Sequence, residues 1–228
     1  STTPIPTGTT SQEFCNAAKV SDLQTNESDI RWYTDPTSGT ALAPTVALTN
    51  STWYYASQVL NSCESVSRMP VLATINVTAA PTGAATQSFC NTAKVSDLQA
   101  SGTTIKWYAD SANGTPLDSD EALINNTMYY ASQTLNSCES ETRLPVLVTV
   151  NATPAPSGDI DQTLLEDKTI ADIVVIGSEI KWYESAENAI SNTSSLDTAL
   201  ALEKGKTYYA TQTVDGCSSV NFLAVTIS

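Results

Sequence analysis

The chain has 228 residues, no histidine, and 24 acidic against 10 basic side chains, which gives a formal net charge of −14. This charge excludes a nucleic-acid-binding protein, because phosphate backbones require a basic surface. The lack of histidine excludes the commonest zinc ligand and rules out Ser-His or Cys-His activation of a nucleophile. No run of 18 apolar residues occurs, so no segment is expected to span a membrane.

A unit of about 75 residues is repeated along the chain, and this repeat is the main guide to its organisation. The first two copies share the stretches KVSDLQ, YYASQ and LNSCES, and a third copy is more distant. Positions that recur at one constant offset are Cys15 and Cys90, Trp32 and Trp107, Tyr54 and Tyr129, and Cys63 and Cys138. Trp182 keeps this offset, but Tyr208 and Cys217 lie slightly further from their counterparts, so a short insertion is placed between Trp182 and Tyr208.

The repeat predicts three domains, at residues 1–80 (with a linker at 1–8), 81–155 and 156–228. Proline-containing joints that end in glycine separate the copies, and joints of this kind are stiff and extended. Residues 4–8 have the form of a linker that follows a domain. We therefore expect a further repeat before residue 1 and regard the chain as a segment of a longer array.

Strand-like patterns follow in chain order within each copy. In the first copy residues 30–33 read as a strand, and the later alternation places one set on a common face: Val71, Ala73, Ile75 and Val77. In the second copy residues 127–133 read as a strand after a turn-rich segment at 111–114, and Val146, Val148 and Val150 alternate. Val225 and Ile227 continue the pattern in the third copy. Short strands at this spacing predict an all-β fold, with each domain a sandwich of two antiparallel sheets.

The motifs resemble a known family. The order Phe-Cys, Val-Ser-Asp-Leu, Lys-Trp-Tyr, Tyr-Tyr-Ala-Ser-Gln, Cys-Glu-Ser and Arg-x-Pro-Val is similar to the immunoglobulin-like repeats of large Bacteroidota cell-surface proteins of the gliding and adhesin type. The resemblance covers residues 11–78 and 86–153 strongly and 159–228 more weakly. It implies three tandem immunoglobulin-like domains in an elongated array, export by type IX secretion, and no enzymatic activity.

Five cysteines indicate an oxidising, extracellular location. Cys15 with Cys63 and Cys90 with Cys138 are the predicted disulfides, because each pair lies within one repeat. Leu165 occupies the first-cysteine position of the third repeat, so Cys217 is predicted to be an unpaired thiol. The alternatives for Cys217 are an intermolecular disulfide, a partner in another domain, or a reactive site. A zinc site is disfavoured, since the cysteines are spread singly without a Cys-x-x-Cys pair.

The tryptophans are predicted to be either core residues or ligand contacts. Trp32, Trp107 and Trp182 align in all copies at strand centres, which favours the core over an aromatic platform. Trp53 is replaced by Met128 and Thr207 in the other copies, so it is the predicted candidate for an exposed ligand contact. Each Tyr-Tyr pair should place one ring inward and one outward.

The carboxylates give no strong site. The aligned residues Asp22, Asp97 and Asp172 are expected to make turn hydrogen bonds rather than bind Ca²⁺, and Asp118 to Glu121 is the best local calcium candidate. We predict no metal, no cofactor and no catalytic residue. The family resemblance implies O-glycans at Asp-Ser/Thr followed by an apolar residue, which suggests Ser111 and Thr198 as acceptors.

Together these features predict a non-catalytic segment of an extracellular, multi-repeat surface protein, such as an adhesin stalk or filament. The alternatives are a carbohydrate- or protein-binding module and a self-assembling fibre subunit. The expected partners are neighbouring repeats, other copies of the chain, or surface glycans, with no nucleic acid and no membrane insertion.

Overall fold

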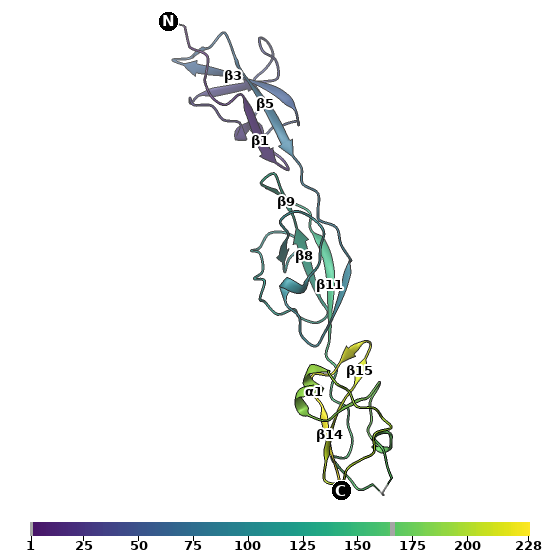
Figure 1. Ribbon diagram of the computed structural model, residues 1–228. Coiled ribbons are helices and arrows are strands. Elements are labelled where there is room, and N and C mark those ends of the chain that lie inside the picture. Colours follow the sequence, from purple (N-terminus) through teal and green to yellow (C-terminus); the bar gives the residue numbers. More distant parts are fainter. Residues whose placement is uncertain (1, 165–166) are drawn as a thin grey trace. The chain divides into compact units, whose positions relative to one another are not determined.

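The computed structural model describes residues 2–164 and 167–228, and most of its regular elements are β-strands (Figure 1). Leu165, predicted to occupy the first-cysteine position of the third repeat, lies outside the described residues. The chain divides into two compact units, and the boundary between them runs through the second repeat. One unit comprises Ser1–Gly83, Ala100–Pro116 and Tyr130–Pro145, and the other comprises Ala84–Gln99, Leu117–Tyr129 and Val146–Ser228.

The first unit contains the complete sheet of the first repeat, in the order β1-β5-β3-β2. Its strands are β1 (Ser11–Cys15), β2 (Ile30–Tyr33), β3 (Thr52–Leu60) and β5 (Met69–Asn76), and the short β4 (Cys63–Glu64) forms a hairpin with the end of β3. The unit also contains the single-turn 3₁₀-helix η1 (Val20–Asp22), β7 (Lys106–Tyr108), β9 (Thr134–Leu135) and β10 (Cys138–Glu139).

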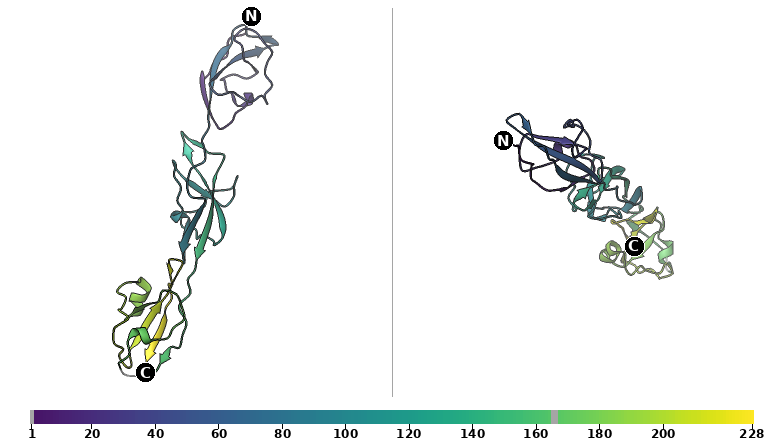
Figure 2. Two further views of the ribbon diagram at one scale, coloured as in Figure 1. Left: turned by 90° about the vertical axis from the view of Figure 1, so that its right-hand side faces the viewer. Right: turned by 90° about the horizontal axis from the view of Figure 1, so that it is seen from above.

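The main sheet of each repeat is mixed, which differs from the antiparallel sheets expected from the sequence. β1 pairs with β5 in parallel, with Cys15 opposite Asn76. Figure 2 gives two further views of the chain. Parallel neighbours need a long crossover connection. The rest of the repeat supplies it here, because β1 is the first strand of the repeat and β5 is the last.

The sequence predicts a second antiparallel sheet facing the first one. Among the described residues, the layer that faces the first sheet is not such a sheet. It consists of η1 and extended segments, joined by one isolated bridge between Lys19 and Ala47. Residues 35–51 contain two prolines, a glycine and many Ser and Thr residues, which favour turns over a long strand.

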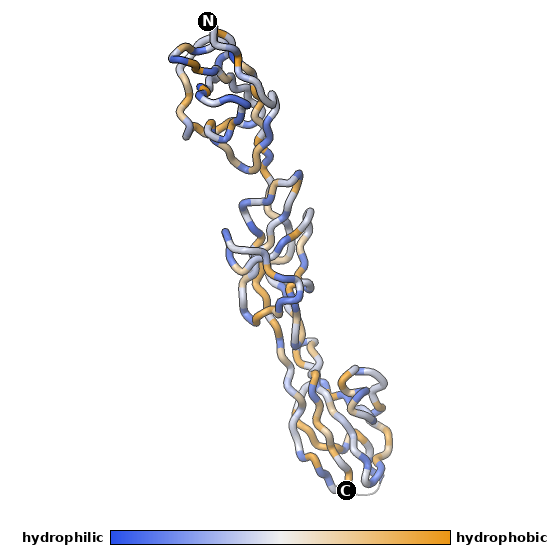
Figure 3. The backbone as a smooth tube through the Cα atoms, turned by 90° about the vertical axis from the view of Figure 1, so that its left-hand side faces the viewer, coloured by the Kyte–Doolittle hydropathy of each residue, from blue (hydrophilic) through white to orange (hydrophobic). Residues whose placement is uncertain are grey.

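The core of the first repeat follows the predicted alternation. Val71 and Ala73 are fully buried and Ile75 is nearly so, and they pack with Trp32, Tyr54 and Val20. Val77 departs from the prediction, because β5 ends at Asn76 and Val77 is 74% exposed. Figure 3 shows how hydrophobic and hydrophilic positions follow one another along the backbone.

The second unit contains the sheet of the third repeat, in the order β12-β17-β14-β13. Its elements are β12 (Asp161–Gln162), η3 (Ile170–Asp172), β13 (Lys181–Tyr183), α1 (Ala186–Ser191), β14 (Thr207–Thr211), β15 (Thr213–Val214), β16 (Cys217–Ser218) and β17 (Leu223–Ile227). α1 lies in the stretch where the sequence predicts an insertion. Ser185 begins it as an N-cap, accepting a hydrogen bond from Asn188 N.

The second repeat has the same strand order, β6-β11-β8-β7. The strands are β6 (Thr86–Cys90), β8 (Thr127–Ser132) and β11 (Leu144–Asn151) with β7, and η2 (Val95–Asp97) precedes β7. β6 and β11 form the parallel pair, with Cys90 opposite Asn151. The predicted boundaries of three domains stay a prediction, since the two compact units divide this repeat.

Candidate functional site

Two disulfides join consecutive repeats. Cys15 bonds to Cys138 with a Cα–Cα distance of 5.1 Å, and Cys90 bonds to Cys217 with a distance of 5.2 Å. In both cases the first cysteine is the last residue of the first strand of a repeat. The second lies in a two-residue strand of a hairpin, either β10 or β16, in the next repeat. Each bridge lies within one of the compact units.

This arrangement corrects the predicted pairing of Cys15 with Cys63 and of Cys90 with Cys138. Cys15 lies opposite Asn76, the last residue of β5. Cys63 lies toward the other end of the sheet, because it pairs with Leu60, which lies beyond the part of β3 that pairs with β5. About eleven strand residues separate these two positions along the sheet, or roughly 36 Å. A disulfide requires Cα atoms within about 7 Å, so pairing within the repeat is excluded.

Cys217 and Cys63 therefore exchange their predicted roles. Cys217 is buried and bonded to Cys90, which agrees with the alternative of a partner in another domain. Cys63 is the free cysteine among the described residues, and it is exposed.

A set of hydrogen bonds surrounds the first disulfide. The Thr78 hydroxyl donates to the Cys138 carbonyl at 2.9 Å, and the Asn16 amide donates to the Glu139 carbonyl at 2.8 Å. The Thr78 N–H donates in turn to the Asn16 side-chain oxygen at 3.2 Å. We call this group a junction: the Cys-Asn end of the first strand, the linker threonine, and the hairpin of the following repeat.

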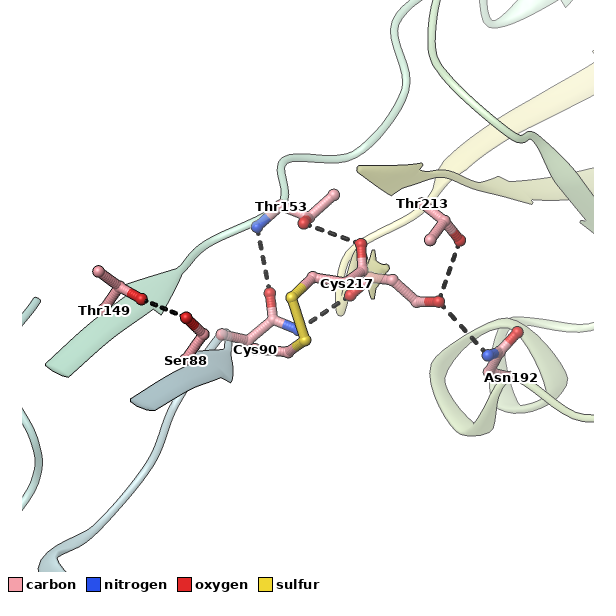
Figure 4. Close-up of a disulfide and its surroundings, with 9 residues drawn as sticks. Ser88, Cys90, Thr149, Thr153, Asn192, Thr213 and Cys217 are labelled. Atoms are coloured by element: carbon pink, nitrogen blue, oxygen red, sulfur yellow. Dashed lines mark hydrogen bonds between the residues drawn. A yellow bond between two sulfur atoms is a disulfide. The ribbon is translucent and has the colours of Figure 1, made fainter. Parts of the chain in front are cut away.

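The second junction has the same bonds (Figure 4). The Thr153 hydroxyl donates to the Cys217 carbonyl at 2.9 Å, and the Asn91 amide donates to the Ser218 carbonyl at 2.9 Å. The Thr153 N–H donates to the Asn91 side-chain oxygen at 3.2 Å. Two independent occurrences of the same bonds show that the junction is a repeated device and not an isolated contact.

The asparagine is suited to its place by its backbone. Asn16 and Asn91 have φ of 60° and 62°, in the left-handed region that asparagine tolerates better than most residues. Their N–H groups donate to the carbonyls of Asn76 and Asn151, at the end of the last strand of the same repeat. The turn after the disulfide thereby directs the amide toward the next repeat.

A half-buried carboxylate supports the hairpin of the second repeat. Glu139 accepts hydrogen bonds from Lys106 at 2.8 Å, Ser132 at 2.6 Å and Tyr108 at 2.5 Å. Burial alone would raise the pKa of Glu139, but these three donors outweigh it and hold the pKa at about 2. The side chain of Glu139 thus fixes the strand whose carbonyl receives Asn16.

The first repeat holds Glu64 in the same way. Ser57, Tyr33 and Arg31 donate to its carboxylate at 2.5, 2.6 and 2.7 Å. These hydrogen bonds, with that of Ser57 the largest cause, lower the pKa of Glu64. The third repeat has Ser218 at this position, and its hydroxyl lies within hydrogen-bond distance of Thr213 and Asn192 instead (Figure 4).

The predicted aromatic residues lie as follows. Trp32, Trp107 and Trp182 are buried in their repeats, with exposed fractions of 7%, 8% and 4%. Trp53 is 46% exposed on β3. The first tyrosine of each Tyr-Tyr pair is the inward one, and the hydroxyl of Tyr54 accepts a hydrogen bond from Thr49 N.

The remaining candidates lie on the surface. Ser111 is exposed in a bend and Thr198 is exposed in a turn. Asp22, Asp97 and Asp172 accept hydrogen bonds from the backbone three residues earlier and so close the 3₁₀ turns. No group of three metal-ligating side chains occurs within residues 2–164 and 167–228. No helix in this described part of the chain is long and apolar enough to cross a bilayer.

Sequence reasoning missed the junction residues, although a signal was present. Asn16 and Asn91 belong to the repeated Phe-Cys-Asn stretch, and Thr78 and Thr153 recur at the same offset in the linkers. It also missed Arg68, whose guanidinium lies 3.4 Å from the centre of the Tyr33 ring and which donates to the carbonyls of Asp35 and Ser38. Arg143 and Tyr108 repeat this contact in the second repeat.

A family model described as Ig-like domain, CHU_C associated, matches residues 3–76 and 79–152, which together exceed half of the chain. The chain belongs to this Ig-like family. Domains of this type are typically non-catalytic structural modules, and the two matched ranges are tandem Ig-like repeats. No curated protein sequence matches the chain.

Several solved structures are similar to this Ig-like chain, all at low identity. Extracellular domains 3–5 of Drosophila OTK match with 14% identity and a TM-score of 0.24, covering 97% of this chain and 95% of that one. The I-band fragment I67–I69 of titin matches with 8% identity and a TM-score of 0.31, covering 100% and 97%. The four N-terminal Ig domains of Dscam1 match with 10% identity and a TM-score of 0.24, covering 100% and 73%. TM-scores this low do not establish a shared fold, so the Ig-like assignment rests on the family match alone.

Proposed function

We propose that the chain is a non-catalytic, load-bearing segment of an extracellular, multi-repeat bacterial surface protein, in which junctions tie each Ig-like repeat to the next. The observation that carries the proposal is the pair of disulfides between consecutive repeats, each surrounded by the same three hydrogen bonds. A bridge within a repeat stabilises that repeat alone. A bridge between repeats also transmits tension from one repeat to the next.

The location and the route of export belong to this proposal. Disulfides persist in oxidising compartments, which supports a place outside the cytoplasm. The Ig-like family and its resemblance to Bacteroidota surface repeats favour display on a cell by type IX secretion, with Ser111 and Thr198 as exposed positions for O-glycans. A net charge of −14 would keep neighbouring copies apart by mutual repulsion.

A tethering experiment tests the mechanical role. The chain is anchored at its carboxyl end and loaded through a bead at its amino end, under constant force without reductant. We expect the unaltered chain to reach only a short maximum extension, and the Cys15→Ser/Cys90→Ser variant to extend much further under the same force. Equal maximum extensions of the two proteins would show that the bridges carry no load.

A second candidate function is a carbohydrate- or protein-binding module, and the exposure of Trp53 favours it. Exposed aromatic rings commonly contact ligands through their flat faces. Binding to immobilised glycans that is lost in Trp53→Ala and kept in Met128→Ala would establish this role. Absence of binding by the unaltered chain would leave the load-bearing role as the one that the junctions support.

A further inference from the structure

The free cysteine of the first repeat occupies the place that is bonded in the other two repeats. Cys63 aligns with Cys138 and Cys217, and all three lie in a two-residue strand paired with the strand before it. Cys138 and Cys217 each bond to the cysteine of a Cys-Asn strand end. The two formed junctions thus serve as internal comparison structures for Cys63, and in both of them the aligned cysteine has a partner.

The linker threonine is already in position at Cys63. The Thr3 hydroxyl donates to the Cys63 carbonyl at 2.9 Å, the same bond and the same length as from Thr78 to Cys138 and from Thr153 to Cys217. Residues 1–8 align with residues 76–83 at the offset of the repeat, which places Thr3 at the position of Thr78.

The remaining atoms of the junction have counterparts too. In the formed junctions the asparagine bridges the linker threonine N–H and the carbonyl of the residue after the cysteine. These atoms correspond to Thr3 N and Glu64 O in the first repeat. The Glu64 carboxylate is held by Ser57, Tyr33 and Arg31, much as Glu139 is held in the formed junction.

We propose that Thr3, Cys63 and Glu64 form the receiving half of a third junction, whose occupant is the Cys-Asn strand end of another repeat of this Ig-like family, joined ahead of Thr3 in the same polypeptide. The linker threonine indicates which repeat supplies the Cys-Asn strand end. Thr78 contacts both Asn16 of its own repeat and Cys138 of the next, so the donor of each Cys-Asn end is the repeat that the linker leaves. Thr3 already contacts Cys63, so the donor is the repeat that precedes it.

A second copy of the chain fits this site less well. Its Cys15 and Cys90 are both already bonded. The proposal deepens the proposed function and rests on it, because it takes the junction as the unit from which a longer load-bearing array is built.

The bond-forming step uses a disulfide oxidant such as oxidised glutathione. One thiolate attacks a sulfur of the oxidant and releases the first glutathione thiolate, which gives a mixed disulfide. The second cysteine thiolate attacks that mixed disulfide, forms the protein bridge, and releases the second glutathione thiolate. Two protein thiols are oxidised, and one oxidised glutathione is reduced to two thiols.

A tandem duplication tests the proposal with the full chain present. A copy of residues 1–75, carrying Cys63→Ser, is placed directly before Ser1. The upstream Cys15 then precedes the downstream Cys63 by 123 residues, the separation of Cys15 and Cys138. After refolding with oxidised glutathione, N-ethylmaleimide labelling and intact mass count the free thiols.

We expect no labelled thiol in the duplicated protein and one in a matched control that also carries Cys15→Ser in the upstream copy. Two labelled thiols in the duplicated protein, with the two original bridges intact, would overturn the proposal. Covalent dimers would also overturn it, because they would show that a second copy is the preferred partner. A tether that bears load while both thiols stay free would overturn this inference and leave the proposed function standing.

A second measurement uses the unaltered chain and does not depend on folding of the duplicated protein. A peptide with the sequence Ser-Phe-Cys-Asn-Ala is equilibrated with Cys63 against glutathione, beside a control peptide in which alanine replaces the asparagine. We expect roughly a tenfold preference for the asparagine peptide, from its two hydrogen bonds to Thr3 N and Glu64 O. Equal equilibrium constants for the two peptides would contradict the inference.

Discussion

The two disulfides overlap along the sequence, and this overlap sets the length that the chain can reach under force. The perturbation is reduction of both bridges in a chain already unfolded by tension between its ends. In the oxidised chain the shortest covalent path crosses from Cys15 to Cys138, returns along the backbone to Cys90, and crosses again to Cys217. Only about a third of the residues then carry the load, and the remaining residues are shielded from it.

Reduction releases all of the shielded length. About 150 residues join the path, and an extended residue spans about 3.4 Å, so the tether should lengthen by about 500 Å. Pairing within repeats, as predicted from the sequence, would shield only the two separate loops that such bridges close. At the same rise per residue, reduction of those two bridges would release about 300 Å.

Optical or magnetic tweezers with added reductant measure this change directly. The steps should occur one bridge at a time, and the Cys15→Ser/Cys138→Ser variant should show the single step of the remaining bridge. A total release at the smaller of the two lengths would refute the pairing between repeats, and no release would refute the presence of bridges.

Three further predictions concern the same junctions. Cyanogen bromide cleaves after Met69 and Met128, and the three fragments should stay joined until reductant is added; free release of residues 1–69 without reductant would contradict the bridge from Cys15 to Cys138. The lowered pKa of Glu139, at about 2 against an ordinary 4.5, stabilises the fold above pH 4.5, and this contribution disappears as the pH falls from 4.5 toward 2. Chemical unfolding should therefore show that Glu139→Gln costs about 2 kcal/mol at pH 6 and little near pH 2, and an equal cost at both pH values would contradict this role of the carboxylate. Asn16→Gly keeps the left-handed turn but removes the side chain, and should destabilise the first junction by about 1–2 kcal/mol in thermal or denaturant unfolding; an unchanged stability would show that the asparagine bonds are not used.

The sequence allowed the repeat unit, the strands and the core to be predicted because these depend on local patterns. The constant offset placed Trp107 after Trp32, and the alternation around Val71 identified a buried strand face. Alternation does not report strand direction, however, so the parallel pairing of β1 with β5 was not foreseen. The turn-rich residues 35–51 likewise did not reveal that the facing layer would lack a regular sheet.

The cysteine pairing could not be settled from spacing. In a tandem repeat a bond within a unit and a bond to the next unit use the same two aligned positions, so the alignment fits both. The choice depends on which end of the sheet each cysteine occupies, and that follows from the register of β3 and β5. The third repeat did carry a clue, because it keeps Cys217 and has Leu165 at the first position. The bond from Cys90 uses Cys217 of the third repeat and needs no cysteine at position 165.

The interlaced bridges also affect how the chain withstands proteolysis. A single cut anywhere between Cys15 and Cys217 leaves both pieces held together, because at least one sulfur bridge always spans the cut. With bonds confined to each repeat, one cut in a linker would release everything beyond it. A chain with one such nick therefore stays a single covalently joined molecule.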